Sequence, residues 1–122
     1  MERSHRSREP ENGGLSLRID LPHGRVGPGK IALLETIDRE GSISAAGRAL
    51  GMSYRRAWGL VDALNKIVGT PVVATSPGGP HGGGAQLTGA GRALVADYRM
   101  IERKARRVAQ PHLAALLERT RG

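Results

Sequence analysis

The sequence predicts a mainly α-helical domain that carries one small β-hairpin. Two stretches, from about Pro28 and from Tyr54, place apolar residues at helical spacing, and a segment rich in Gly and Pro over 76–85 separates two short β-prone runs. The chain has no Phe, one Trp and two Tyr, so its core must consist of Leu, Ile, Val and Ala, which favours close-packed helices. At 122 residues it fits a single domain, since one domain takes roughly 100 to 200 residues.

The first 14 residues, MERSHRSREPENGG, are predicted to form a disordered arm. They are polar and charged, a composition that cannot offset the entropy lost on ordering. After this arm, apolar and polar residues alternate from Leu15 to Leu21, which predicts a half-buried strand. Pro22 and Gly24 are expected to end that strand.

Two helices are predicted next. The first runs from about Pro28 to Gly41, where glycine supplies a C-terminal stop. Ser44 is predicted to cap the second helix by accepting a hydrogen bond from a free backbone amide. This second helix is short because Gly51 ends it.

A tight turn, Gly51 to Ser53, leads into a third helix that runs from Tyr54 to about Val68. Gly51 can adopt the left-handed conformation, and Ser53 is placed to cap the third helix. A short helix, a turn that contains glycine and a longer helix together form a helix-turn-helix candidate.

Beyond the third helix the sequence predicts a β-hairpin with strands at residues 71–75 and 86–87. The ten residues 76–85 between them include five Gly and two Pro, which predicts a long, mobile tip. A helix-turn-helix followed by such a hairpin describes a winged helix.

A long final helix is predicted to begin at a cap provided by Thr88. Its apolar positions alternate in steps of four and three, as in a coiled-coil seam. This seam predicts a dimer interface formed by Leu94, Tyr98, Ile101, Ala105 and Val108. Pro111 cannot lie inside an uninterrupted helix without a kink or a break. We therefore expect a separate short helix or tail over 110–122, after a DNA-binding domain over 15–109.

The charge balance indicates a polyanionic partner. Nineteen Lys and Arg against eleven Asp and Glu give a net charge of +8, with seven basic and three acidic side chains in residues 97–122. Double-stranded DNA is the predicted partner. The basic residues of the last helix form either a solvated face or a surface over DNA phosphates: Arg99, Arg103, Lys104, Arg106 and Arg107.

Several classes of function are excluded or disfavoured. Because the chain has no Cys, it can form no disulfide framework, thiolate zinc site or cysteine nucleophile. No metal site is expected from the four histidines, which lack ligand spacing: His5, His23, His81 and His112. No catalytic arrangement or cofactor motif is present, and no apolar run is long enough to span a bilayer. A cytoplasmic protein that is not an enzyme is expected.

Two segments carry a resemblance to a known family: IALLETIDREGSISAAGRALGMSYRRAWGLVDALN and, behind it, GGPHGGGAQLTGAGRAL. They resemble the N-terminal DNA-binding domain of molybdate-responsive regulators of the ModE type, which is similar to the LysR-type head. The resemblance extends from Leu15 to about Ile101. It implies a homodimer joined by the last helix, a third helix in the major groove and a wing on the flanking backbone. The family's C-terminal molybdate-binding domains are not expected in this chain, so a protein partner carrying the sensor function is a further possibility.

The predicted DNA contacts follow from this arrangement. Arg55 and Arg56, at the N-terminal end of the third helix, are predicted to contact base edges, and Ser53 and Tyr54 to make phosphate or mixed contacts. The alternative for the two arginines is a solvated basic turn. The wing tip is predicted to offer backbone amides to phosphate, with a tip free of contacts as the alternative. The predicted DNA-contacting residues are Ser44, Ser53, Tyr54, Arg55, Arg56, Gly79, His81, Gly82 and Gly83.

Trp58 shares the third helix with Val61 and Leu64, and the preferred interpretation is that all three pack in the core. Base stacking by Trp58 is the alternative.

The leading hypothesis is a homodimeric, sequence-specific transcriptional regulator that recognises an inverted repeat. An architectural protein that binds DNA with little sequence preference is the second hypothesis. The third is an antagonist without a sensor domain that forms heterodimers with a full-length regulator.

Overall fold

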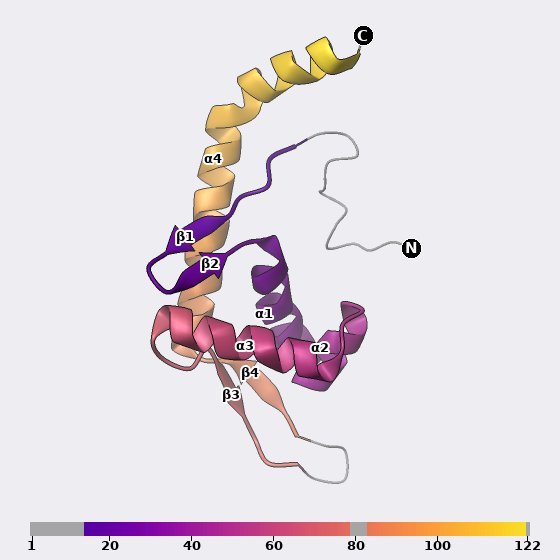
Figure 1. The fold of residues 1–122 in the computed structure, drawn as a ribbon, viewed down its shortest axis with the longest axis vertical. Coiled ribbons are helices and arrows are strands. Elements are labelled where there is room, and N and C mark those ends of the chain that lie inside the picture. Colours follow the sequence, from indigo (N-terminus) through magenta and orange to yellow (C-terminus); the bar gives the residue numbers. More distant parts are fainter. Residues whose placement is uncertain (1–13, 79–82, 122) are drawn as a thin grey trace.

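The computed structural model describes residues 14–78 and 83–121, and within them it has the mainly helical fold with a small hairpin that the sequence predicts. The predicted disordered arm lies, except for Gly14, outside the described residues. Figure 1 shows the elements in chain order. They are β1 (Ile19–Leu21), β2 (Gly24–Val26), α1 (Pro28–Glu40), α2 (Ile43–Ala49), α3 (Tyr54–Val68), β3 (Val73–Thr75), β4 (Ala85–Leu87) and α4 (Gly89–Arg121).

α1 is the central helix of the fold. It contacts α2, α3, α4, β2 and β4, and its large apolar side chains are fully buried. The largest buried side chains are aliphatic, as predicted, with one tyrosine among them: Val26, Ile31, Leu33, Leu34, Ile37, Val61, Leu64, Val72 and Tyr98. Gly41 ends α1 in the left-handed conformation (φ 81°) and donates its N–H to the Ile37 carbonyl at 2.8 Å, as the sequence predicts.

The strand predicted over 15–21 is shorter than expected and has a partner that the sequence analysis did not identify. β1 contains only three residues, which pair antiparallel with β2 from Ile19↔Val26 to Leu21↔Gly24. The turn fixes this register, and β2 ends where α1 begins, so no strand remains to pair with the residues before Ile19. Two of those residues bond to α4 instead: the Leu17 carbonyl accepts a hydrogen bond from Tyr98 Oη at 2.8 Å, and the Leu15 carbonyl accepts one from Arg106 Nη2 at 3.2 Å.

The helix-turn-helix forms as predicted, with one correction at its first cap. Ser42, not Ser44, caps α2, because its side chain accepts a hydrogen bond from the Ala45 amide at 3.0 Å. The helix begins at Ile43, so Ser44 already lies in its first turn. Ser53 caps α3 as predicted and accepts from the Arg56 amide at 3.1 Å.

The wing is fixed to α1 by backbone hydrogen bonds. β3 and β4 pair antiparallel from Val73↔Leu87 to Thr75↔Ala85. The Ala85 amide also donates to the Gly41 carbonyl at 2.8 Å. The C-terminal end of α1 therefore sets the direction in which the wing leaves the domain (Figure 1).

α4 begins at the predicted cap. Thr88 Oγ1 accepts from the Gly91 amide at 3.1 Å and donates to the Pro71 carbonyl at 2.7 Å. The sequence predicted a separate helix or tail after Pro111, and this prediction was wrong. α4 continues through Pro111 to Arg121. Figure 1 shows a change of direction where the helix turns from orange to yellow. Proline removes one hydrogen bond and its ring clashes with the preceding turn, so the helix kinks and then resumes.

An ion-pair network joins α4 to α1. Arg99 forms a two-pronged pair with Glu35, with contacts of 2.7 and 2.9 Å, and a further bond to Glu102 at 2.7 Å. Arg106 bonds to the other oxygen of Glu102 at 3.2 Å and to the Leu15 carbonyl. The hydrogen bond to Glu35 is the largest cause of a raised pKa for Arg99. Arg99 therefore stays positively charged. These two arginines therefore belong to neither the solvated face nor the DNA-facing surface considered from the sequence.

The first turn of α4 packs directly on the backbone before β3. A Cβ added at Gly91 would collide with the Val72 carbonyl oxygen, whereas a Cβ at Gly89 meets no atom within 4 Å. We therefore expect Gly91→Ala to lower the free energy of unfolding by about 1 to 3 kcal/mol, the usual cost of overpacking. Urea denaturation followed by circular dichroism measures this. Gly89→Ala is the matched control, and equal stability of the two variants would contradict the close approach.

Candidate nucleic-acid interface

α3 presents one face to the core and the opposite face to solvent. Ala57, Val61 and Leu64 are buried at 0 to 2% exposure. At 3.6 residues per turn, Arg55 and Gly59 lie on the opposite side of the helix, where both are exposed. This outward face thus carries a cation followed one turn later by a small residue.

The two arginines predicted to contact bases point in different directions. Arg55 lies on the outward face of α3, whereas Arg56 lies about 100° further round and lines a cleft with Met52 and Leu60. Of the two, only Arg55 therefore lies on the outward face of α3. Arg56 lies on the flank of the helix.

Trp58 does not pack in the core, so the preferred interpretation from the sequence was wrong. It is 38% exposed and makes an edge-to-face contact with Tyr54, with ring centroids 6.3 Å apart. Ala57 takes the buried position, because it is spaced four and seven residues from Val61 and Leu64. The sequence contained this signal, because spacings of four and seven residues fit a helix face better than the three and six residues that separate Trp58 from Val61 and Leu64.

Tyr54 and Trp58 line a hollow of about 500 Å³ between α3, α2 and the base of the wing, which we call the wing hollow. Ser44 and Gly83, two predicted DNA contacts, line it as well. Ser44 Oγ accepts a hydrogen bond from Arg48 Nη1 at 2.8 Å. The wing hollow thus combines aromatic rings, hydroxyls and a guanidinium.

The other predicted contacts are either used locally or not described. Ser53 is exposed, but its hydroxyl oxygen caps α3. Gly79, His81 and Gly82 lie outside the described residues.

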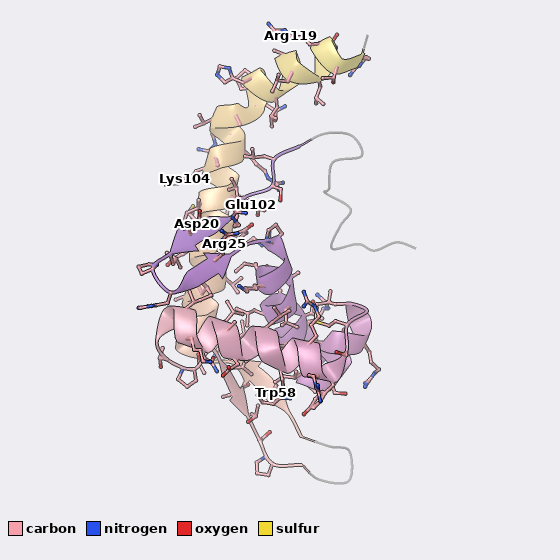
Figure 2. The ribbon with its side chains drawn as sticks, viewed as in Figure 1. Asp20, Arg25, Trp58, Glu102, Lys104 and Arg119 are labelled. Carbon is pink, nitrogen blue, oxygen red and sulfur yellow. The ribbon has the colours of Figure 1, made fainter. Side chains whose placement is uncertain are left out.

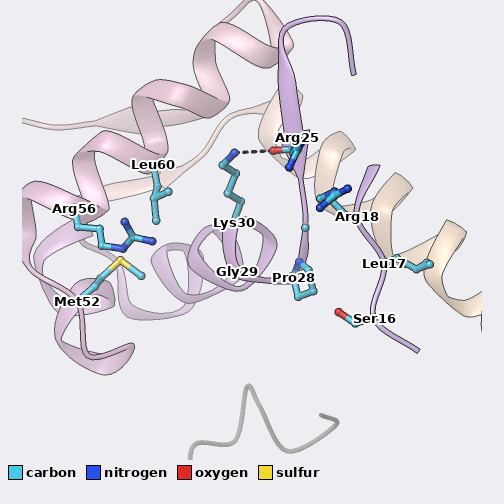
Figure 3. Close-up of a pocket in the computed structure, with 11 residues that line it drawn as sticks. Ser16, Leu17, Arg18, Arg25, Pro28, Gly29, Lys30, Met52, Arg56 and Leu60 are labelled. Atoms are coloured by element: carbon cyan, nitrogen blue, oxygen red, sulfur yellow. Dashed lines mark hydrogen bonds between the residues drawn. The ribbon is translucent and has the colours of Figure 1, made fainter. Parts of the chain in front are cut away.

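A second depression, on the opposite flank of α3, escaped the sequence analysis. This hairpin cleft has a volume of about 570 Å³ and lies between α3, the start of α1 and the β1–β2 hairpin (Figure 3). Four cationic side chains line it: Arg18, Arg25, Lys30 and Arg56. They come from four parts of the chain, and the β1–β2 pairing that brings two of them together was not predicted.

The predicted dimer seam divides into two sets. Tyr98 is 1% exposed and Leu94 packs against the core, so both belong to the fold of a single chain. Ile101 and Val108 are 47% and 74% exposed. Together with the half-buried Ala105, they form an exposed apolar stripe along α4, next to the buried positions of the same seam.

Within residues 14–78 and 83–121, no group of three or more His, Cys, Asp or Glu could hold a metal ion. In the same part of the chain, no helix combines the length and the apolar character needed to cross a membrane.

Comparison with known proteins places this geometry among regulators. Residues 29–92 match the family described as bacterial regulatory helix-turn-helix protein, lysR family. This match spans α1 to the first turn of α4 and so includes the whole helix-turn-helix and the wing.

Three relatives illustrate the similarity. The chain is 53% identical over 84 residues to the molybdenum-pterin-binding protein MopB of Rhodobacter capsulatus, covering 69% of this chain and 31% of that protein. It is 47% identical over 73 residues to the molybdenum transport protein ModE of Azotobacter vinelandii, covering 60% and 27%. It is 36% identical over 74 residues to the DNA-binding transcriptional dual regulator ModE of Escherichia coli K12, covering 61% and 28%. The chain thus spans about a third of the length of these relatives.

The exposure of Trp58 generates a test of the wing hollow. We expect Trp58→Ala to weaken binding to duplex DNA by about fivefold or more, equivalent to about 1 kcal/mol. Stability should fall less than in the core variant Leu64→Ala, for which about 2 to 5 kcal/mol is usual. Fluorescence anisotropy of labelled DNA and denaturation followed by circular dichroism measure the two effects. Unchanged affinity, or a loss of stability like that of Leu64→Ala, would contradict a role for the exposed Trp58 in DNA binding.

Proposed function

The chain belongs to the bacterial regulatory helix-turn-helix family of the lysR type, and from that membership we propose that it is a homodimeric transcriptional regulator that binds an inverted repeat. Residues 15–109 are the DNA-binding and dimerising unit, and 110–122 extend the dimerisation helix. The role of regulator, in place of an enzyme, follows from the family and from relatives named as transcriptional regulators.

The observation that carries the proposal is the outward face of α3. This helix is capped at its N-terminus by Ser53, presents Arg55 away from the core, and is flanked by the wing hollow and the hairpin cleft. The major groove of B-DNA is about 12 Å wide and admits one helix. Arg55 would then reach base edges, while the two flanks approach the phosphate backbones on either side.

The exposed side of α4 supports the dimer. Ile101 and Val108 are two helical turns apart on one face, and Leu116, also exposed, follows further along the helix. In a two-fold dimer the same face of each copy meets the other. Two α3 helices would then occupy successive major grooves, so their target is an inverted repeat.

Molybdenum supplies the physiological context of the proposal. The relatives named above are a molybdenum-pterin-binding protein, a molybdenum transport protein and a dual regulator of transcription. We propose that this chain regulates genes for molybdenum supply or use. Because the match covers about a third of each relative, the proposal concerns the binding of DNA by the matched region and assigns no site for molybdenum.

The decisive experiment is selection of bound fragments from the protein's own genomic DNA at near-physiological salt, followed by sequencing. An enriched palindrome upstream of molybdenum-related genes is the expected result. Diffuse enrichment that disappears as salt rises would instead support an architectural protein with little sequence preference.

Replacing Arg55 distinguishes base reading from general attraction. Arg55→Ala should relax discrimination at one position of the selected site by about 1 to 3 kcal/mol, while Arg56→Ala should weaken all sequences uniformly. Competition between single-base variants of the site measures both. Arg119→Ala, at the far end of α4 (Figure 2), is the control. A uniform loss from Arg55→Ala would favour the architectural alternative.

Polar replacement of the exposed seam tests the dimer. Ile101→Glu with Val108→Glu should convert the protein to a monomer in analytical ultracentrifugation, because four carboxylates would meet across the two-fold axis. Arg103→Glu with Gln110→Glu has the same spacing on another side of the helix and should remain dimeric. A wild-type protein that is already a monomer would contradict the proposal and favour an antagonist that pairs with a full-length regulator.

A further inference from the structure

The hairpin cleft concentrates positive charge that the helix-turn-helix and the wing leave unexplained. Its four cations converge from the segment before β1, from β2, from α1 and from α3 (Figure 3). Lys30 extends between α3 and the hairpin and donates from Nζ to the Arg25 carbonyl at 2.6 Å. The cleft is thus built around a lysine held by the backbone of β2.

Little negative charge offsets these cations. Asp20 lies 3.4 Å from Arg18 Nε and 3.5 Å from Arg25 Nε, and all three side chains are more than half exposed. Within the described residues, neither Lys30 nor Arg56 has an ion-pair partner. Four positive charges therefore face one carboxylate. The first turn of α1, which borders the cleft, also contains no acidic residue.

The position of the cleft relative to α3 identifies its partner. Arg56 and Leu60 line the hairpin cleft, whereas Tyr54 and Trp58 line the wing hollow. A helix that lies in the major groove has one phosphate backbone on each side, about 12 Å apart. With α3 in such a groove, the wing hollow would face one of these backbones and the hairpin cleft the other.

We propose that the hairpin cleft binds the phosphate backbone of duplex DNA on the side of α3 opposite the wing. Arg25 and Lys30 contact phosphates there, Arg56 joins the cleft to the recognition helix, and Asp20 moderates the attraction. This inference rests on the proposed DNA binding and adds a second backbone contact made by the β1–β2 hairpin. Such contacts position a protein on DNA and carry no sequence information directly.

The test measures how affinity for a mixed-sequence 30-base-pair duplex depends on salt, which requires no knowledge of the target site. Each phosphate contact contributes about 0.9 to the slope of log affinity against log salt. Arg25→Gln with Lys30→Gln should lower the slope by about 2 and weaken binding at least tenfold near 0.1 M salt. Arg119→Gln with Arg121→Gln removes two charges at the far end of α4 (Figure 2) and should change the slope by less than half as much. Equal effects of the two pairs, or an unchanged slope in the cleft variant, would overturn the proposal.

Asp20→Asn provides a test in the opposite direction. Because it removes the carboxylate beside Arg18 and Arg25, it should tighten DNA binding severalfold, an effect that damage to the fold would not produce. Weaker or unchanged binding would contradict the assigned role of the cleft.

A titration with inorganic phosphate distinguishes a small-anion site from a DNA surface. We expect only millimolar affinity, since the cleft is open to solvent and built for one part of a long polyanion. Micromolar phosphate binding that is lost in the Arg25 and Lys30 variant, together with an unchanged DNA slope, would assign the cleft to a free oxyanion instead. Failure of the proposed function is seen separately, as the absence of an enriched sequence in the genomic selection.

Discussion

The burial of α1 is the constraint on which the placement of the other elements depends. Its apolar residues, Ile31, Leu33, Leu34 and Ile37, are inaccessible to solvent, and α2 and α3 pack against them. Its polar groups face the remaining elements. Glu35 pairs with Arg99 of α4, Asp38 accepts from the Leu87 amide of β4, and the Gly41 carbonyl accepts from Ala85. One helix therefore orients α3, the wing and α4 together.

In the proposed dimer, this arrangement would couple DNA recognition to dimer geometry through charged as well as apolar contacts. Glu102 is 7% exposed and lies between Arg99 and Arg106. Removing one member of such a buried network leaves an uncompensated charge, which costs more than an exposed ion pair contributes. Because α4 carries the exposed Ile101 and Val108 within and just after this network, its rigid attachment would set the separation and angle of the two α3 helices in the proposed dimer. Flexibility there would spread that separation and weaken selection of one half-site spacing.

Local signals in the sequence were sufficient to predict most of the helices and strands and several of the residues that begin or end them. Gly41, Ser53 and Thr88 act where predicted because caps and stops depend on the chemistry of a few neighbouring residues. The same reasoning chose Ser44 where Ser42 is the cap. Two serines on either side of Ile43 compete for the same role, and the packing of Ile43 decides where the helix begins. It failed for Trp58 because helical spacing allows either of two neighbouring residues to face the core. Ala57 fits the close approach of α2 and α3, and the tryptophan turns outward.

The sequence by itself determined the helix-turn-helix with its wing, the aliphatic core and the excess of positive charge, because these follow from residue type and short-range spacing. Only the tertiary structure decided how that charge is divided. Arg99 and Arg106 bond to carboxylates on α1 and α4, whereas Arg18, Arg25, Lys30 and Arg56 gather in one cleft. No local pattern predicts this division, because it depends on the pairing of β1 with β2 and on the rotation of α3. Electrostatic interactions act between residues that are close in space, and the fold alone makes them close.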